Sequence, residues 1–190
     1  MIDVEAAFRE IEKVRGDAIV IPCQTARHAW HRVSTRPELD VFFRGVMGKG
    51  SSLGLGLALA RPERKVIVFD GDGSLLMNLG SLATIATQAP PNLYLFVIEN
   101  GVYAGTGGQP IPGSGLVSFA GIAKSCGFRA VFEYSELDAL IPAVPSIIDA
   151  TGPVFVDLKT ELVSDGHKKD DNLPDIKQGF TQLRRMFDPR

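Results

Sequence analysis

Two short polar motifs follow two buried apolar runs, and their side chains could together bind a metal ion and a phosphate. Gly71-Asp72-Gly73-Ser74 follows the run 65–70, and Asn100-Gly101 follows the run 93–99. Both runs are rich in β-branched and aromatic residues, which is typical of buried strands. Asp72 offers a carboxylate oxygen and Asn100 an amide oxygen, which are ligands that Mg²⁺ prefers. The neighbouring backbone N–H groups can hold phosphate.

The element between these motifs predicts that they meet at one edge of a sheet. A helical segment over residues 75–88 separates the two runs, which makes a strand–helix–strand unit. The strands of such a unit are parallel, and in open α/β sheets ligands bind at the carboxyl ends of the strands. The alternative is that Asp-Gly and Asn-Gly are two ordinary tight turns that bind nothing.

The rest of the chain continues the alternation of strand and helix. This predicts a single doubly wound α/β domain, with a mostly parallel sheet and helices on both faces. Further strands are expected at residues 17–22, 41–43, 129–132 and 154–158, and further helices at 4–14, 24–33, 51–60, 118–126 and 135–149. Residues 102–116 hold five glycines and no periodicity, which predicts a long functional or mobile loop. We expect the domain to span residues 1–160, and residues 161–190 to form a polar segment and an amphipathic helix.

Composition and charge argue against several classes of partner. The net charge is −2 and 22% of the residues are charged, so neither nucleic acid nor a membrane is an expected partner. No run is long and apolar enough to span a bilayer, and the first residues lack the apolar core of a signal peptide. The two cysteines, Cys23 and Cys126, form no Cys-x-x-Cys motif, and we expect a reducing, cytoplasmic location.

The spacing of the two motifs resembles that of the thiamine diphosphate (ThDP) enzymes, in which Gly-Asp-Gly precedes Asn by a spacer in the high twenties. Asp72 and Asn100 are 28 positions apart. The resemblance implies a diphosphate-binding domain with ThDP and Mg²⁺ as cofactors. The metal ligands that it implies are Asp72, Asn100 and the backbone carbonyl of Val102, and the further cofactor contacts are Gly71, Gly73, Ser74 and Tyr103. We expect Asp72 to lie at an exposed strand end, away from the core.

Two other segments match cofactor contacts of the same family. Met47 stands where relatives have a bulky aliphatic residue that bends the cofactor, and the Gly45 carbonyl would accept a hydrogen bond from the aminopyrimidine ring. Thr25 and His28 follow the first strand, where relatives place a polar group against the diphosphate. The alternatives are a plain core methionine for Met47 and a surface or capping histidine for His28.

Residues 100–110, Asn-Gly-Val-Tyr-Ala-Gly-Thr-Gly-Gly-Gln-Pro, resemble the corresponding loop of phosphonopyruvate and sulfopyruvate decarboxylases. In the family, a glutamate on a separate pyrimidine-binding domain activates the cofactor, and this chain has no room for that domain. The resemblance therefore implies a β-type subunit of a split ThDP-dependent decarboxylase of a small 2-oxo acid. It implies no catalytic residue on this chain and an α-type partner that supplies the glutamate, in a hetero-oligomer such as α2β2 or larger. An acetolactate synthase-like carboligase or lyase, and a non-catalytic ThDP-binding remnant, are the alternatives.

Overall fold

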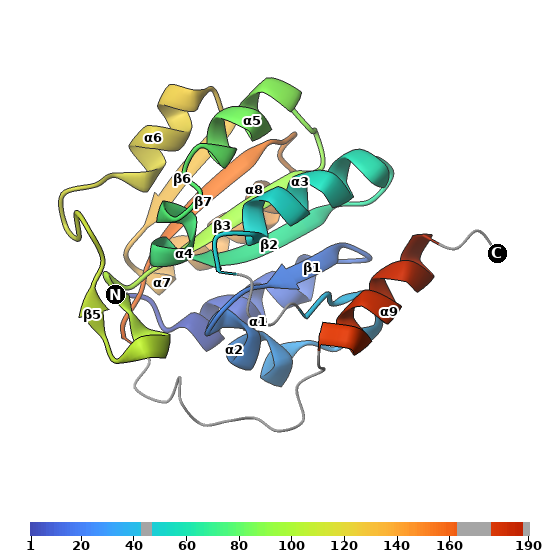
Figure 1. Cartoon of the computed structure of the whole chain (residues 1–190), viewed down its shortest axis with the longest axis horizontal. Coiled ribbons are helices and arrows are strands. Elements are labelled where there is room, and N and C mark those ends of the chain that lie inside the picture. Colours follow the sequence, from blue (N-terminus) through green and yellow to red (C-terminus); the bar gives the residue numbers. More distant parts are fainter. Residues whose placement is uncertain (43–46, 163–175, 188–190) are drawn as a thin grey trace.

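Five parallel strands form the central sheet of the computed structural model (Figure 1). The structure describes residues 1–42, 47–162 and 176–187. The strands are β1 (Ile19–Pro22), β2 (Val66–Gly71), β3 (Leu93–Glu99), β6 (Ala130–Tyr134) and β7 (Val154–Lys159), in the spatial order β1-β2-β3-β7-β6. Because every neighbouring pair is parallel, all five carboxyl ends lie at the same edge of the sheet.

Side chains alternate between the two faces of the sheet, and helices cover both. On β2, Ile67 and Phe69 belong to one hydrophobic cluster, and Val66 and Val68 belong to the other. The first face is covered by α1 (Val4–Val14), α2 (Ala26–Val33), α7 (Leu137–Leu140) and α8 (Val144–Asp149), and the second by α3 (Gly50–Ala60), α4 (Asp72–Leu76), α5 (Ser81–Gln88) and α6 (Phe119–Cys126). The predicted doubly wound α/β fold is confirmed.

The packing of α1 holds α2 against the first face of the sheet. Asp3 caps α1, since its Oδ1 accepts a hydrogen bond from the Ala6 N–H at 2.7 Å. The ring of Phe8 lies 5.6 Å from that of Trp30 on α2 and 4.2 Å from that of Phe69 on β2. Burying Phe8 in this cluster stabilises the fold by roughly 2 to 3 kcal/mol. These contacts hold α2 against the sheet.

The prediction of one continuous helix over residues 75–88 is wrong. It is divided into α4 and α5, and residues 77–80 form the turn between them. The Asn78 N–H donates to the Leu75 carbonyl at 3.0 Å, and the Ser81 N–H donates to the Asn78 carbonyl at 2.9 Å. Asn78 and Gly80 both have low helix propensity, which explains the interruption.

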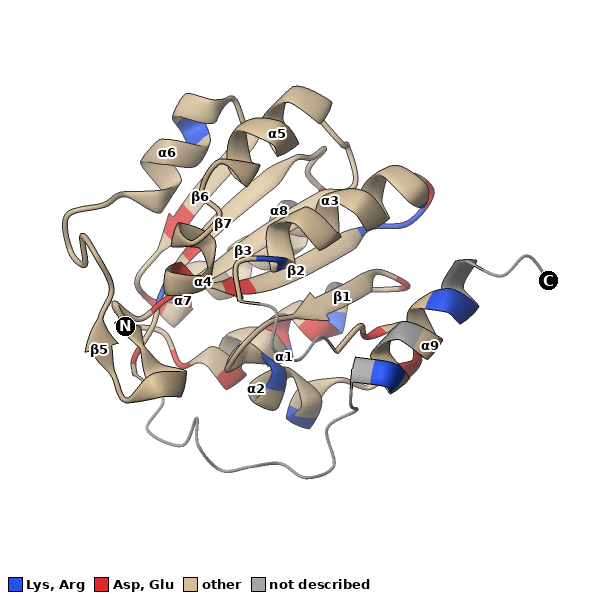
Figure 2. Cartoon of the chain, in the orientation of Figure 1, with Lys and Arg blue, Asp and Glu red and all other residues tan. Residues whose placement is uncertain are grey.

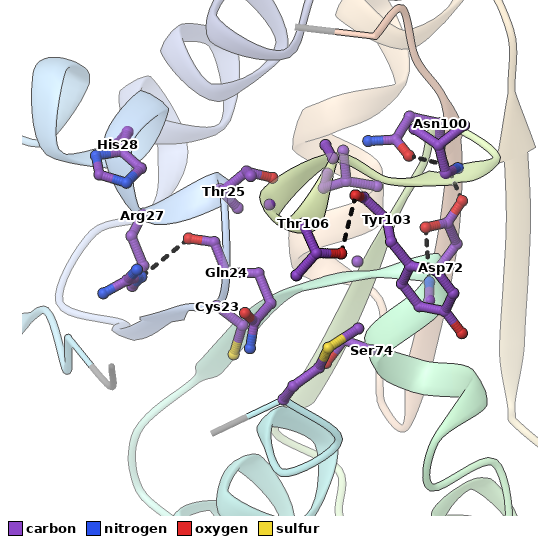
Figure 3. Close-up of a pocket in the computed structure, with 18 residues that line it drawn as sticks. Cys23, Gln24, Thr25, Arg27, His28, Asp72, Ser74, Asn100, Tyr103 and Thr106 are labelled. Atoms are coloured by element: carbon purple, nitrogen blue, oxygen red, sulfur yellow. Dashed lines mark hydrogen bonds between the residues drawn. The ribbon is translucent and has the colours of Figure 1, made fainter. Parts of the chain in front are cut away.

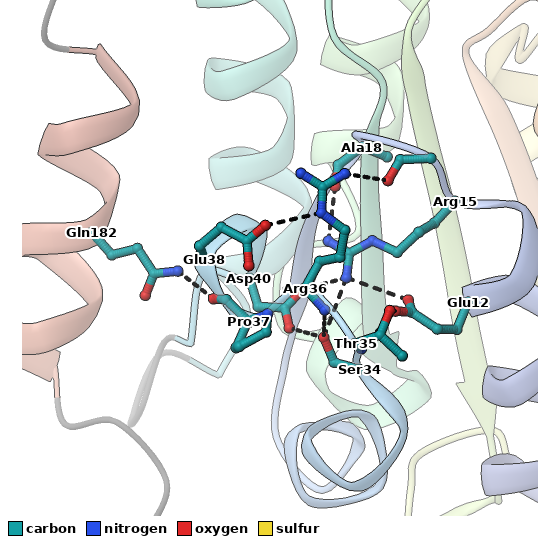
Figure 4. A network of polar contacts seen from close by, with 11 residues as sticks. Glu12, Arg15, Ala18, Ser34, Thr35, Arg36, Pro37, Glu38, Asp40 and Gln182 are labelled. Atoms are coloured by element: carbon teal, nitrogen blue, oxygen red, sulfur yellow. Dashed lines mark hydrogen bonds and ion pairs between the residues drawn. The ribbon is translucent and has the colours of Figure 1, made fainter.

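The strand predicted at residues 41–43 is not a strand of the sheet. Asp40 forms an isolated bridge with Val20, the Val41 N–H donates to the Val20 carbonyl at 2.7 Å, and Phe43 lies outside the described residues. Asp40 is fully buried and forms an ion pair with Arg15 at 2.8 Å (Figure 4). This ion pair and the Val41 hydrogen bond, rather than a continuous ladder of hydrogen bonds, hold the segment beside β1.

The predicted C-terminal amphipathic helix is present as α9 (Ile176–Phe187). Its Gln182 side chain donates to the Pro37 carbonyl (Figure 4), and Leu183 packs against the hydrophobic cluster of the second face. A Cβ atom on Gly179 would lie 2.4 Å from the carbonyl oxygen of Phe42, so the close approach of the helix requires glycine there. The predicted domain boundary at residue 160 stays a prediction.

The segment over residues 102–116, predicted to be a loop without regular structure, contains a small hairpin. Strands β4 (Val102–Tyr103) and β5 (Gln109–Pro110) are antiparallel, and a short 3₁₀ helix, η2 (Ala104–Thr106), joins them. The Ile111 N–H donates to the Gly101 carbonyl at 3.0 Å, which anchors the hairpin beside the end of β3.

The remaining short helices lie in the connections. The 3₁₀ helix η1 (Pro37–Leu39) precedes Asp40. The 3₁₀ helix η3 (Ile141–Ala143) lies between α7 and α8, so the helix predicted over residues 135–149 is divided there. Over the residues that the structure describes, no helix has the length and apolar character needed to cross a membrane.

Candidate functional site

A cavity of about 280 Å³ lies at the carboxyl ends of β1, β2 and β3 (Figure 3). Ten of the eleven residues predicted as cofactor contacts line it: Thr25, His28, Met47, Gly71, Asp72, Gly73, Ser74, Asn100, Val102 and Tyr103. The eleventh, Gly45, lies outside the described residues. The structure therefore brings together residues that are up to 78 positions apart in the sequence, and their individual roles stay predictions.

Asp72 is buried, and the prediction that it lies exposed is wrong. It is 2% exposed, and its carboxylate accepts three hydrogen bonds from backbone N–H groups. Oδ1 accepts from Gly73 at 2.6 Å, and Oδ2 accepts from Asn100 at 3.0 Å and from Gly101 at 2.7 Å. The carboxylate therefore connects the end of β2 directly to the end of β3.

Asn100 is held by a local turn. Its Oδ1 accepts a hydrogen bond from the Val102 N–H at 3.0 Å, and Gly101 between them has a φ of +76°. Only glycine adopts that backbone conformation readily. The turn places the Asn100 amide oxygen beside Asp72 and orients it from within its own segment (Figure 3).

The oxygens at this end of the cavity fit a magnesium ion that also binds a diphosphate. Asp72 is the only carboxylate among the described residues that line the cavity. Mg²⁺ sites typically combine one or two carboxylates with phosphate oxygens, so further negative charge would come from the ligand. A Cβ atom on Gly71 would meet no atom within 4 Å, and Gly71 lines the cavity. There is thus open space for a group that approaches the backbone closely.

Tyr103 covers the Gly-Asp-Gly motif. A Cβ atom on Gly73 would lie 2.5 Å from Cε1 of Tyr103 and 3.0 Å from Cγ2 of Ile111. The aromatic ring therefore lies directly over the Gly73 backbone, and the hairpin shields the Asp72 carboxylate from water. This contact explains why Asp72 is buried at a strand end.

Ser74 contacts the segment that carries Met47. Its Oγ accepts a hydrogen bond from the Gly48 N–H at 2.9 Å, and Ser74 is 2% exposed. Gly48 has a φ of +78°, so Met47 and Gly48 form a turn that glycine permits. The Ser74 hydroxyl thereby fixes the turn that presents Met47 to the cavity.

The cavity is also lined by residues that sequence reasoning did not assign to it. Among them, Cys23, Gln24 and Arg27 follow β1, and Thr106 belongs to the hairpin. Gln24 has a φ of +49°, and its buried Nε2 has no hydrogen-bond partner among the described residues. Nothing in the sequence predicts that a glutamine would adopt a left-handed backbone conformation at this position. Arg27 could have been noted, because it is a charged residue close to the end of a predicted strand.

Acidic residues gather at this edge of the sheet, and burial changes their ionisation (Figure 2). Burial raises the pKa of Asp70 to about 6, although hydrogen bonds from the Ser74 side chain and the Gly71 N–H oppose the shift. Burial also raises the pKa of Asp72, and its three backbone hydrogen bonds act in the opposite direction. The backbone N–H groups thus stabilise the charged form that a metal ion needs.

A second acidic group lies next to the cavity, on β3 and β7. Lys159 Nζ donates to Glu99 Oε2 at 2.6 Å and to Asp157 Oδ2 at 2.9 Å. Asp157 is fully buried, and burial raises its pKa to about 7. The ammonium group bridges the end of β3, immediately before Asn100, to the neighbouring strand.

Comparisons with known proteins agree with this geometry. A family model described as "Thiamine pyrophosphate enzyme, C-terminal TPP binding domain" matches residues 22–158. The chain is 40% identical over 157 residues to phosphonopyruvate decarboxylase of Streptomyces viridochromogenes, covering 82% of this chain and 38% of the relative. It is 37% identical over 156 residues to sulfopyruvate decarboxylase subunit beta of Methanothermobacter thermautotrophicus, covering 82% of this chain and 80% of the relative.

A solved structure shows the same fold. The thiamine diphosphate-dependent 4-hydroxybenzoylformate decarboxylase of Rhodococcus jostii superposes with a TM-score of 0.70 at 21% identity, over 86% of this chain and 33% of that one. The chain thus spans about a third of that enzyme and about two fifths of the phosphonopyruvate decarboxylase, but four fifths of the beta subunit. The predicted resemblance is confirmed: the chain belongs to the thiamine pyrophosphate enzyme family, and residues 22–158 match its C-terminal TPP-binding domain.

Proposed function

We propose that this chain is the diphosphate-binding, β-type subunit of a heteromeric ThDP- and Mg²⁺-dependent 2-oxo acid decarboxylase. The substrate class is that of sulfopyruvate or phosphonopyruvate. The observation that carries the proposal is the match to sulfopyruvate decarboxylase subunit beta, which covers most of both chains. A relative named as a subunit supports an α-type partner, and we propose a hetero-oligomer such as α2β2 or larger. The free cysteines Cys23 and Cys126 are consistent with the cytoplasmic location that we propose.

The cavity residues support the assignment of the cofactors. Asp72, Asn100 and the carbonyl of Val102 would hold Mg²⁺, and the metal would neutralise the diphosphate of ThDP. When bound, ThDP supplies the electron sink that accepts the electron pair released with CO₂. Met47 would support the middle of the cofactor, while Thr25 and His28 would face its diphosphate.

The chain's own part in the reaction is to bind, orient and exclude water. The backbone N–H groups of Gly73, Asn100 and Gly101 favour the charged form of Asp72 and fix its carboxylate, so a metal ion meets a ligand that is already oriented. Tyr103 and the hairpin cover this end of the cavity. No residue of this chain is proposed to move a proton, because the activating glutamate is expected from the partner subunit.

The test is a CO₂-release assay with sulfopyruvate, phosphonopyruvate and pyruvate, in the presence of Mg²⁺ and ThDP. We expect the chain alone to be inactive and its complex with the pyrimidine-binding partner to be active on one of the first two acids. Turnover by the single chain would refute the split enzyme. A complex that releases one CO₂ for every two 2-oxo acids and joins the remaining carbons into one product would identify the carboligase alternative. A complex that binds ThDP without turnover would identify the non-catalytic remnant.

A further inference from the structure

The cavity carries opposite charges at its two ends. Asp72 and Asn100 lie at one end, and Arg27 lies at the other, on the first turn of α2 (Figure 3). Arg27 is the only lysine or arginine among the described residues that line the cavity, as Asp72 is the only carboxylate. Because the end at Asp72 is proposed to hold a metal ion and the diphosphate, the positive charge of Arg27 would face a different anionic group.

We propose that Arg27 binds the sulfonate or phosphonate tail of the substrate and so selects 2-oxo acids that carry a second anionic group. This inference rests on the proposed function. It assigns to Arg27 a specificity-determining role for the second anionic group of the substrate, whereas Thr25, His28 and the metal ion at Asp72 are proposed for the diphosphate.

The guanidinium group of Arg27 is positioned by the backbone of the preceding turn. Its Nε donates a hydrogen bond to the Gln24 carbonyl at 2.9 Å. The left-handed conformation of Gln24, with a φ of +49°, gives this carbonyl its direction. Arg27 is half-buried, so its charge is less screened by solvent than that of a surface arginine. A fixed, half-buried guanidinium is suited to bind an oxyanion.

The chemistry of the tail matches this group. A sulfonate is fully ionised at neutral pH and presents three acceptor oxygens, and a phosphonate is similar. The planar guanidinium can donate two parallel hydrogen bonds to such a group, whereas the methyl group of pyruvate offers it no acceptor. Charge-assisted hydrogen bonds of this kind predict that the loss of Arg27 weakens binding of the tail about 10- to 100-fold.

The experiment uses the complex of this chain with its partner subunit and compares Arg27→Gln, Arg27→Lys and a control, Arg9→Gln. Arg9 is exposed on α1 and pairs with Glu5, away from the cavity. The measurements are KM for sulfopyruvate and phosphonopyruvate, the Kd of ThDP with Mg²⁺, and calorimetric binding of 3-sulfopropanoate to the ThDP-loaded complex. The last compound has the tail and the carboxylate of sulfopyruvate but no keto group.

We expect Arg27→Gln to raise KM and the Kd of 3-sulfopropanoate about 10- to 100-fold, with the Kd of ThDP changed less than twofold. Arg27→Lys should restore part of the binding, and Arg9→Gln should change nothing. A parallel loss of ThDP affinity would assign Arg27 to the diphosphate and overturn the proposal, as would unchanged binding of 3-sulfopropanoate. A wild-type complex that binds 3-sulfopropanoate but releases no CO₂ would overturn the proposed function alone, and the Arg27→Gln titration would still decide this inference.

Discussion

The contact between Gly73 and Tyr103 makes a sharp prediction about the two glycines of the Gly-Asp-Gly motif. In Gly73→Ala the new methyl group would lie 2.5 Å from Cε1 and 2.8 Å from Cδ1 of Tyr103. Ordinary contact begins at 3.4 Å, so the ring would have to retreat by about 0.9 Å. The hairpin resists this movement, because the Tyr103 carbonyl accepts from the Gly108 N–H at 3.0 Å. Ile111, the other neighbour, is 4% exposed.

Two effects of opposite sign determine how much Gly73→Ala changes the free energy of unfolding. Overpacking of this kind destabilises a protein by about 1 to 3 kcal/mol. Alanine in place of glycine within α4 returns roughly 0.5 to 1 kcal/mol of helix stability. We therefore expect Gly73→Ala to lower the free energy of unfolding by roughly 1 to 2 kcal/mol, and to increase hydrogen exchange at the Gly108 amide.

Gly71→Ala is the matched control, because its methyl group would meet no atom within 4 Å and its φ of −87° suits alanine. We expect a change below about 0.5 kcal/mol for this variant. Urea unfolding of both variants and the wild type at 25 °C measures the difference. If Gly73→Ala proves as mild as Gly71→Ala, Tyr103 does not lie over the motif in solution and the account of Asp72 burial fails.

Three further outcomes are expected. Asp72→Ala should abolish Mg²⁺-dependent ThDP binding in the complex and also lower the free energy of unfolding by roughly 3 kcal/mol, because three backbone N–H groups lose their acceptor; calorimetry and urea unfolding measure the two effects. Asp157→Asn should change the pH dependence of stability. The ordinary pKa of 3.8 is raised to about 7 in the folded state, so the unfolded chain ionises first and the wild type loses stability between about pH 4 and 7. Between pH 5 and pH 8 the free energy of unfolding of the variant should rise by on the order of 2 kcal/mol relative to that of the wild type. A difference in unfolding free energy that stays constant across this range would contradict the assigned pKa. Amides within residues 102–116 should exchange more slowly when Mg²⁺ and ThDP are added to the complex, and equal protection would show that the hairpin does not respond to the cofactor.

The place of the site in the fold could be predicted from local patterns. The β-branched runs before Gly71 and Asn100 specify buried parallel strands, and the carboxyl ends of adjacent parallel strands must converge. That inference needs no knowledge of tertiary packing, so it placed Asp72 beside Asn100 correctly.

The surroundings of the site could not be predicted, because they depend on contacts between distant segments. Asp72 is buried since Tyr103, 31 positions later, lies over Gly73. Gln24 adopts a left-handed conformation that its residue type does not indicate. The break between α4 and α5 had a local signal in Asn78 and Gly80, but the apolar periodicity across them favoured a continuous helix.

The bonds from Asp72 to the backbone of Asn100 and Gly101 also couple the assembly of the site to folding. They close a segment of 28 residues, and loop-closure entropy opposes such a contact until the chain between its ends is organised. The parallel pairing of β2 with β3 closes the same part of the chain, so the contact and the strand pairing share one entropic cost. A nascent chain that lacks this pairing has no assembled metal site, so the cofactor can stabilise only molecules in which this part of the sheet is complete.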